Sequence, residues 1–457
     1  MLKSLITGYG AWLLCMTVLP SSLFARECKS KLGVYLKPVP FVSGLSWSIE
    51  AVGSLGVVNG TERDLTVRTG MLLFALDYQF AQGSPHQLYL EGGLKRWSRT
   101  ERGPGSLTDG LGWRGYPSID KGPRPWRQAF YKFDDGKTAF TAGLQEMNMG
   151  GSFLLDERVL GVSISRMAGP FKIDLYTGTV SKYFARMGDY CALWHTYAFL
   201  QGGRFNLVSD NLWESNLAGA VLSWKPSPGS DAKDPESEEI SVEEEGNSDE
   251  EEFVFEEVGD EEFGLLDEPS GGFLSEASLF FLEEFGSHFH EYKYYYGAMA
   301  ELRLPAAFLM DVEVVSQHIL DDKALAYNLA IKRDLAWSSG GLTDFKLGYI
   351  GKMALDESAR FYPTFSNLFL GETARLDAVD MPLFYGSVKH TIPWKLKPSL
   401  RAFALKQTGG ERTSELDLEL GIRLTRGLRA FWIFSRVSTE KLDETAYVNR
   451  VKFRWAF

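Results

Sequence analysis

The side chains that could perform catalysis in this chain are scattered. Its six histidines form no H-E-x-x-H zinc motif, and no G-x-S-x-G nucleophile segment occurs. Only His288 and His290 are near enough in sequence to share a metal ion, and we interpret this pair as a polar turn, with a metal site as the alternative. We therefore predict that the protein is not an enzyme and needs no metal or cofactor.

Charged residues recur instead at a spacing of two. In the segment 415–424, Leu416, Leu418 and Leu420 alternate with Glu415 and Asp417, and the same pattern repeats along much of the chain. An extended strand directs alternate side chains to opposite faces, so each such segment has an apolar face and a polar face. This pattern indicates strands of a transmembrane β-barrel, with lipid outside and water inside.

The last eleven residues show the pattern most clearly. Tyr447, Val451, Phe453, Trp455 and Phe457 share one face, whereas the other carries Arg450, Lys452, Arg454 and Ala456. The alternative is an amphipathic strand at the end of a soluble domain. The terminal aromatic residue resembles the signal that the bacterial barrel-assembly machinery recognises, and this resemblance implies an assembly signal made of Phe453, Trp455 and Phe457.

The N-terminus predicts export. Lys3 precedes an apolar run and a small-residue segment ending at Ala25, so residues 1–25 form a predicted signal peptide and residues 26–457 the barrel. No later apolar run is long enough for a membrane helix. The mature cysteines, Cys28 and Cys191, either form one disulfide or remain free thiols.

One segment differs sharply from the rest. Residues 229–262 contain 17 Asp or Glu and one Lys, whereas the whole chain has a net charge of −12, so the remainder is net positive. Such charge density with few apolar residues predicts a disordered acidic loop inserted in the barrel. It is either a solvated insertion or a surface that attracts cations.

Short and long connections alternate between the expected strands. Short turns are expected at 134–136, 168–170, 338–341 and 425–427, and longer extracellular loops near 98–126, 148–157, 181–189, 352–380 and 439–445. Counting forward gives about nine strands up to Trp224, and counting back gives about ten from Ser278. Because an odd total is not allowed here, we predict 18 strands, with 16 to 20 open. The forward count favours a surface position for the acidic loop.

The polar faces supply candidates for the lining of a pore. Opposed acidic and basic side chains in a water-filled lumen would sort solutes by charge. The candidate pore-lining residues are Lys132, Gln145, Arg158, Lys172, Lys332, Lys346, Glu419, Arg423, Arg450, Lys452 and Arg454.

Residues 127–145, with an R-Q-A-F-Y start and a G-L-Q end, lead into Asp156-Glu-Arg158 and a hairpin at 169–176. Together with the aromatic–proline segment 361–369, they resemble alginate-export-type barrels and related substrate-selective porins. The resemblance implies about 18 strands and a lumen narrowed by an infolded loop, for which 102–126 is our candidate. Leu144 stands where that family carries an arginine, so export of an anionic polysaccharide does not follow.

These observations predict an outer-membrane channel for passive or substrate-selective diffusion of small hydrophilic solutes. Its expected partners are outer-membrane lipid and the barrel-assembly machinery, possible self-association is left open, and no nucleic acid is expected. The alternatives are a channel that exports an anionic polysaccharide and a surface-display or adhesive barrel without transport.

Overall fold

The computed structural model describes the residues that form the strands and most of the short turns. These are residues 36–39, 42–59, 64–81, 83–102, 126–150, 154–180, 215–226, 273–286, 292–354, 361, 382–394, 396–407, 413–425, 427–439 and 445–456. The predicted signal peptide, the acidic segment, Cys28, Cys191, His288, His290 and Phe457 lie outside the described residues.

Nearly all of the described chain is β-strand. The strands are β1 (Lys37–Pro38), β2 (Leu45–Asn59), β3 (Asp64–Gln79), β4 (His86–Arg102), β5 (Trp126–Asp134), β6 (Thr138–Met149), β7 (Leu155–Ala168), β8 (Phe171–Val180), β9 (Ser215–Trp224), β10 (Leu274–Gly286), β11 (Lys293–Leu304), β12 (Phe308–Ile319), β13 (Asp322–Ala336), β14 (Leu342–Ala354), β15 (Leu383–Thr391), β16 (Ser399–Gln407), β17 (Thr413–Arg423), β18 (Leu428–Thr439) and β19 (Thr445–Ala456). A short 3-10 turn, Pro305–Ala307, joins β11 to β12. No helix in the described part of the chain has the length and apolarity needed to cross a bilayer.

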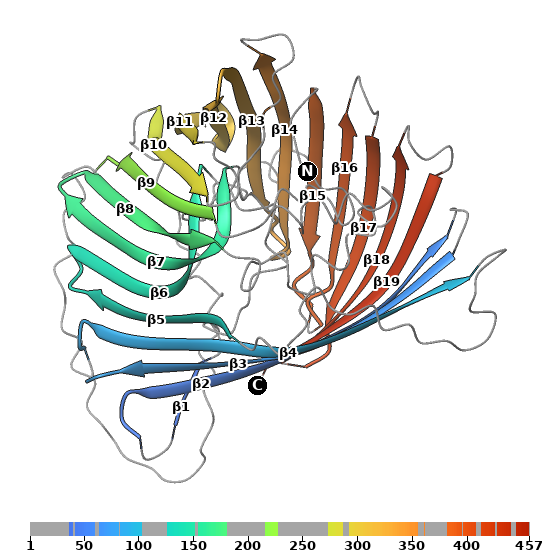
Figure 1. Cartoon of the computed structure of the whole chain (residues 1–457). Helices are drawn as coiled ribbons and strands as arrows, with labels where there is room; N and C mark the ends of the chain where they lie inside the picture. Colours follow the sequence, from blue (N-terminus) through green and yellow to red (C-terminus); the bar gives the residue numbers. More distant parts are fainter. Residues whose placement is uncertain are drawn as a thin grey trace, which may run out of the picture.

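Eighteen of these strands form a closed antiparallel barrel. Each strand from β2 to β19 pairs with the next along the chain, and β19 pairs with β2 to complete the ring (Figure 1). The two-residue strand β1 pairs with Ser46 and Trp47 of β2, beyond the point where Ala456 ends the β19 ladder opposite Glu50. The barrel and its predicted number of strands are therefore confirmed.

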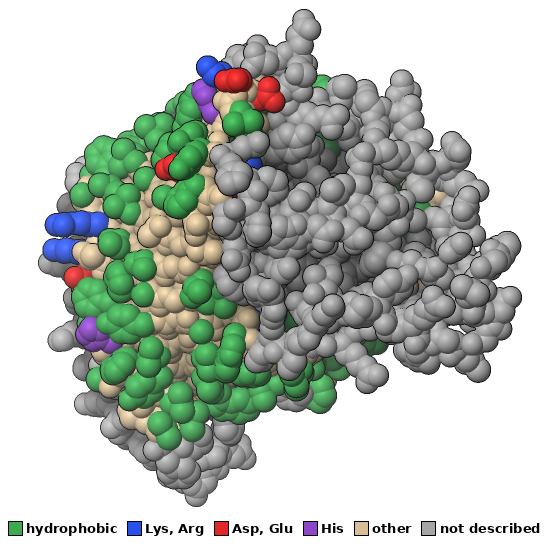
Figure 2. Space-filling model, viewed as in Figure 1, with side chains coloured by type: hydrophobic (Ala, Val, Ile, Leu, Met, Phe, Trp, Pro, Cys, Tyr) green, Lys and Arg blue, Asp and Glu red, His purple; other side chains and the backbone are tan. Residues whose placement is uncertain are grey.

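The two faces of the wall separate apolar from polar side chains. On β17, Leu416, Leu418 and Leu420 are exposed, whereas Glu415 and Asp417 are buried. Large exposed hydrophobic residues recur on the outer face of most strands, and Figure 2 shows them spread over the visible wall. A ring with this outer face keeps its backbone groups hydrogen-bonded and buries its apolar surface in lipid.

Most of the short turns lie on one rim of the barrel, which we call the C-terminal rim because β19 ends there; the two-residue turn between β12 and β13 lies on the opposite rim. At the turn after β5, the amides of Thr138 and Lys137 donate hydrogen bonds to Asp135, and these bonds hold the pKa of Asp135 below its usual value. At the turn after β7, Gly169 adopts a left-handed φ of 62°. The opposite rim, called the distal rim, joins β4 to β5, β8 to β9 and β14 to β15 through long connections.

The two strand ends that flank the acidic segment in sequence, Trp224 of β9 and Leu274 of β10, lie at the C-terminal rim. Eight wall strands, β2 to β9, precede it and ten, β10 to β19, follow it. The expected ninth strand before Trp224 is not part of the wall in the described residues, where only β1 is additional. An even number of crossings returns the chain to the rim from which it started; the acidic segment itself, for which a surface position is expected, lies outside the described residues.

Candidate functional site

The inner face of the barrel carries most of the predicted pore-lining residues. Lys332 and Lys346 are cross-strand neighbours on β13 and β14, and Glu419 and Arg423 share the inner face of β17. The remaining candidates are distributed around the ring, Lys132 on β5, Gln145 on β6, Arg158 on β7, Lys172 on β8, and Arg450, Lys452 and Arg454 on β19. The structure thus brings together Lys332 with Lys346 and Glu419 with Arg423, and it places the three β19 cations on one inner face, whereas the other candidates are spread around the ring.

The most distinctive feature of the lumen is the end of the β6–β7 hairpin, which leaves the wall. Pairing of β5 with β6 stops at Ala129 and Leu144, and pairing of β7 with β8 stops at Leu160 and Thr179. The β6–β7 ladder nevertheless continues to Met149 and Leu155. In Figure 1 these strand ends curve into the interior beside β10. We call residues 145–150 and 154–159 the infolded hairpin end.

Two residues allow the bend. Gly143 has a φ of 128°, and a methyl group there would overlap the carbonyl oxygen of Ala129. The side-chain amide of Gln145 donates to the carbonyl oxygens of Thr141 and Gly161, both at 3.3 Å, and its own oxygen accepts a 2.8 Å bond from Ser163. Gln145, a predicted pore-lining residue, therefore stabilises the bend through these hydrogen bonds.

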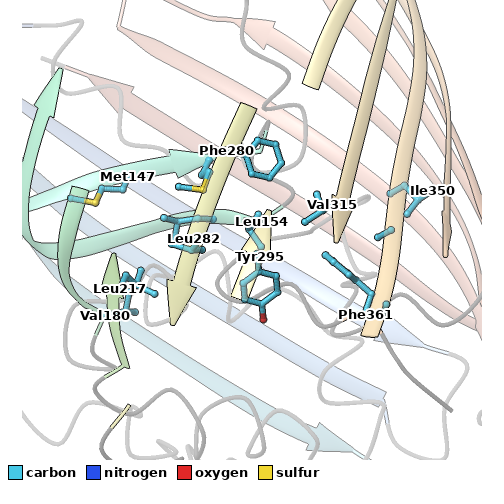
Figure 3. Close-up of a cluster of buried hydrophobic side chains, with 14 of the residues drawn as sticks. Met147, Leu154, Val180, Leu217, Phe280, Leu282, Tyr295, Val315, Ile350 and Phe361 are labelled. Atoms are coloured by element: carbon cyan, nitrogen blue, oxygen red, sulfur yellow. The ribbon is translucent and has the colours of Figure 1, made fainter. Parts of the chain in front are cut away.

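One face of the infolded hairpin end packs against the barrel wall through apolar side chains. Met147, Met149, Leu154, Leu155 and Val159 are buried in a cluster with wall residues of β8 to β16. Figure 3 shows Leu154 beside Leu282, Val315 and Tyr295. Phe361, from the segment that resembles the aromatic–proline loop, joins this cluster with its ring 6.3 Å from that of Tyr295. This face of the infolded hairpin end is therefore occupied by apolar packing against the wall.

The other face of the infolded hairpin end carries charges. Arg158 is only 2% exposed, and it interacts electrostatically with Glu91 of β4, as does Glu146. Glu91 also pairs with Arg127 of β5 at 3.0 Å. A buried charge is tolerated when it is paired in this way. The sequence analysis did not predict Glu91, because its partners lie on other strands and no spacing in the sequence links them to it.

The turn of the infolded hairpin end reaches β12. A Cβ atom added to Gly150 would lie 2.7 Å from Oε1 of Glu313 and 3.4 Å from the ring of Phe280. The expected extracellular loop 148–157 is thus directed into the barrel at its described residues. The constricting loop that the sequence favoured, 102–126, lies outside the described residues except at its ends.

An ionic cluster lines the wall next to this contact. Lys332 lies 2.7 Å from Asp311 and 3.5 Å from Glu301. The hydroxyl of Tyr385 donates a 3.0 Å hydrogen bond to Asn328, and the ammonium of Lys346 lies 5.7 Å from the centre of the Tyr385 ring. Both lysines were predicted as lumen residues, whereas their acidic partners on β11 and β12 were not.

The neighbouring sector, β15 to β19, has more inner-face cations than anions among its described residues. Arg454 forms an ion pair with Glu50 of β2, and Lys452 lies 5.6 Å from the ring centre of Phe431. The inner-face cations of this sector are Lys389, Arg401, Arg423, Arg429, Arg450, Lys452 and Arg454, and the anions are Glu415, Asp417 and Glu419. Such a sector favours negatively charged solutes.

The remaining predicted residues lie near the rims. Lys132 bonds to Asp134 at 2.8 Å and Lys172 to Asp174 at 3.0 Å, both close to turns of the C-terminal rim. Phe453 and Trp455 are exposed on the outer face of β19. Within the described ranges, no group of three or more His, Cys, Asp or Glu residues is arranged to hold a metal ion.

Comparison with solved structures identifies the same architecture. No family profile and no curated protein sequence matches this chain. OpdQ of Pseudomonas aeruginosa has a TM-score of 0.53 and 10% identity over 91% of this chain and 99% of its own. OccK7 (OpdD) of the same organism has a TM-score of 0.53 and 9% identity, with the same coverage of both chains. At this level of identity the likeness shows that the chain shares the barrel fold of these two proteins.

Proposed function

We propose that this protein is a bacterial outer-membrane channel for the diffusion of small hydrophilic solutes. The observation that carries the proposal is a closed ring of 18 strands with an apolar outer face, an ionic inner face and an infolded hairpin end that narrows the lumen. Solutes would be excluded by size beside the hairpin and sorted by charge along the wall. The C-terminal rim would face the periplasm, as is usual for such barrels.

Assembly would use the exposed aromatic residues of the last strand. Phe453 and Trp455 lie on the outer face of β19, and Phe457 completes the expected signal for the barrel-assembly machinery. Replacing Phe457 by Ala should lower the yield of folded barrel in the outer membrane without changing the conductance of the molecules that do assemble.

A second candidate function is transport of an anionic solute, up to the anionic polysaccharide of alginate-export-type barrels. The excess of inner-face cations on β15 to β19 favours it. The paired acids on β11, β12 and β17 argue against a uniformly cationic path. A measured preference for anions, with polysaccharide blocking the current, would favour this candidate over a general channel.

Planar-bilayer recording tests the proposal. The natural protein should give steady single-channel currents, and replacing residues 146–157 by two glycines should raise the conductance because the infolded hairpin end is removed. Deletion of 229–262 is the matched control and should leave the conductance unchanged. A barrel that conducts no ions with or without the hairpin end would instead be a display or adhesive barrel, and the channel proposal would be rejected.

A further inference from the structure

A cavity lies at the C-terminal rim, beside the two-residue strand β1. Pro38 of β1 and residues 42–46 form one side of it, and Asp77 and Gln79 at the end of β3 form the other. Its volume is about 550 Å³, within the range of about 300–1,000 Å³ that holds a small organic molecule. The cavity lies on the inner face of the wall, because Pro38, Ser46 and Asp77 are successive cross-strand neighbours there.

Hydrogen bonds hold the walls of this cavity in place. The amide of Gln79 donates to the carbonyl oxygen of Gly44 at 2.8 Å, and the amide of Val39 donates to that of Leu45, also at 2.8 Å. The strand β1 itself lies beside the start of β2 and pairs with it (Figure 1). The cavity is therefore preformed, and a ligand would lose little free energy in ordering its walls.

One wall of the cavity carries a buried carboxylate. Asp77 is 8% exposed, and the side-chain amide nitrogen of Gln87 donates to both of its oxygens, at 2.8 and 2.9 Å. The cross-strand neighbours of Asp77 on the inner face, Ser46 and Tyr89, are uncharged. Within the described residues no cation pairs with Asp77. An amide supplies no counter-charge, and a buried carboxylate without one is costly.

The facing wall is mostly apolar. Pro38, Val39, Val42 and Leu45 supply hydrocarbon surface, and Val42 is 44% exposed at the edge of the cavity. Asp77 is the one acidic side chain among the described lining residues, whereas a hard divalent cation takes about six or more oxygen ligands. A carboxylate opposite hydrocarbon instead suits an ammonium group on a short apolar chain.

We propose that this cavity binds a small organic amine, whose ammonium group pairs with Asp77 and whose hydrocarbon part lies against Val39 and Val42. The carboxylate can accept the ammonium in addition to the Gln87 amide, because its two oxygens offer about four lone-pair sites. The bond is charge-assisted on both sides and therefore strong. The site does not rest on the channel proposal, since it is formed by the rim of the wall alone.

Isothermal titration calorimetry of the full-length folded barrel in detergent micelles, with n-butylammonium chloride as the probe, tests this site. Asp77→Asn keeps the shape of the side chain and removes its charge, and it should weaken binding about tenfold or more. Asp174→Asn is the matched control, because Asp174 is also an inner-face carboxylate near the C-terminal rim but is paired with Lys172. This variant should bind the amine as the natural protein does.

A second variant separates the cavity from the carboxylate. Ser46→Leu fills the space opposite Asp77 while leaving its charge in place, so it should weaken binding at least as much. The neutral analogue n-butanol should bind the natural protein more weakly than the amine and should not distinguish it from Asp77→Asn. The gel mobility of the folded barrel checks that each variant has assembled.

Four results would overturn the proposal. They are an unchanged affinity in Asp77→Asn, an equal loss in Asp174→Asn, equal binding of n-butanol and the amine, and displacement of the amine by an equal concentration of potassium. The last result would show that Asp77 accepts any monovalent cation and that the apolar wall selects nothing.

Discussion

The seam that closes the barrel depends on a buried ion pair. Glu50 of β2 and Arg454 of β19 are 404 positions apart, and the Nη2 of Arg454 donates a 2.9 Å hydrogen bond to Glu50 Oε2. The carboxylate is fully shielded and the arginine side chain is 13% exposed. Glu50→Gln preserves the shape but removes the negative charge of this buried pair. Removing one partner of a buried pair costs about 3–5 kcal/mol, and we expect the lower value because the amide can still accept one bond.

An exposed pair provides the matched control for this substitution. Lys172 and Asp174 are also joined at 3.0 Å, but their side chains are 47% and 20% exposed. Asp174→Asn should therefore cost less than about 1 kcal/mol. The double variant Glu50→Gln, Arg454→Met should be more stable than Glu50→Gln alone, since it removes both charges of the buried pair.

Urea unfolding in detergent micelles measures these free energies, with tryptophan fluorescence and the gel mobility of the folded barrel as the readouts. A loss of about 3 kcal/mol corresponds to a change of more than 100-fold in the folding equilibrium. If Glu50→Gln and Asp174→Asn lose the same small amount, the seam pair does not stabilise the ring and the reasoning from burial is refuted.

Three further substitutions test other parts of the wall and lumen. In Gly348→Ala the new methyl group would overlap the Tyr385 ring, so we expect a loss of about 2 kcal/mol in urea unfolding; a neutral effect would contradict the close ring-to-glycine packing. Gly143→Ala should straighten the bend of the infolded hairpin end and raise the single-channel conductance, whereas an unchanged conductance would show that the bend does not depend on Gly143. Lys389→Glu changes the charge of a half-exposed inner-face position by two units. For an ion that passes roughly 8 Å from this side chain in water and 0.1 M salt, this change should shift the anion-to-cation permeability ratio about fivefold toward cations. A reversal potential that stays unchanged would place Lys389 outside the conducting path.

The strand faces could be predicted from the sequence because alternation in a strand is a local property. Leu416 and Trp455 face outward and Asp417 and Lys452 inward simply because neighbouring side chains point to opposite sides. The closed ring then follows, since a lipid-facing strand cannot leave an edge unpaired. The strand count of 18 was within reach for the same reason.

The contents of the lumen were not predictable in this way. Met147 and Leu154 read locally as parts of a strand and a loop, and only the three-dimensional structure shows them turned inward against Tyr295. The partners of Arg158 and Arg454 lie on strands far away in sequence, so no spacing links them.

The sequence by itself determined which side of the wall each strand residue faces, because that depends only on its immediate neighbours along the backbone. Tertiary structure alone decided where the hairpin leaves the wall, which charges neutralise one another, and on which rim the acidic segment begins. Each of these depends on how many strands pair with one another, because one added or missing strand moves every later connection to the other rim of the barrel.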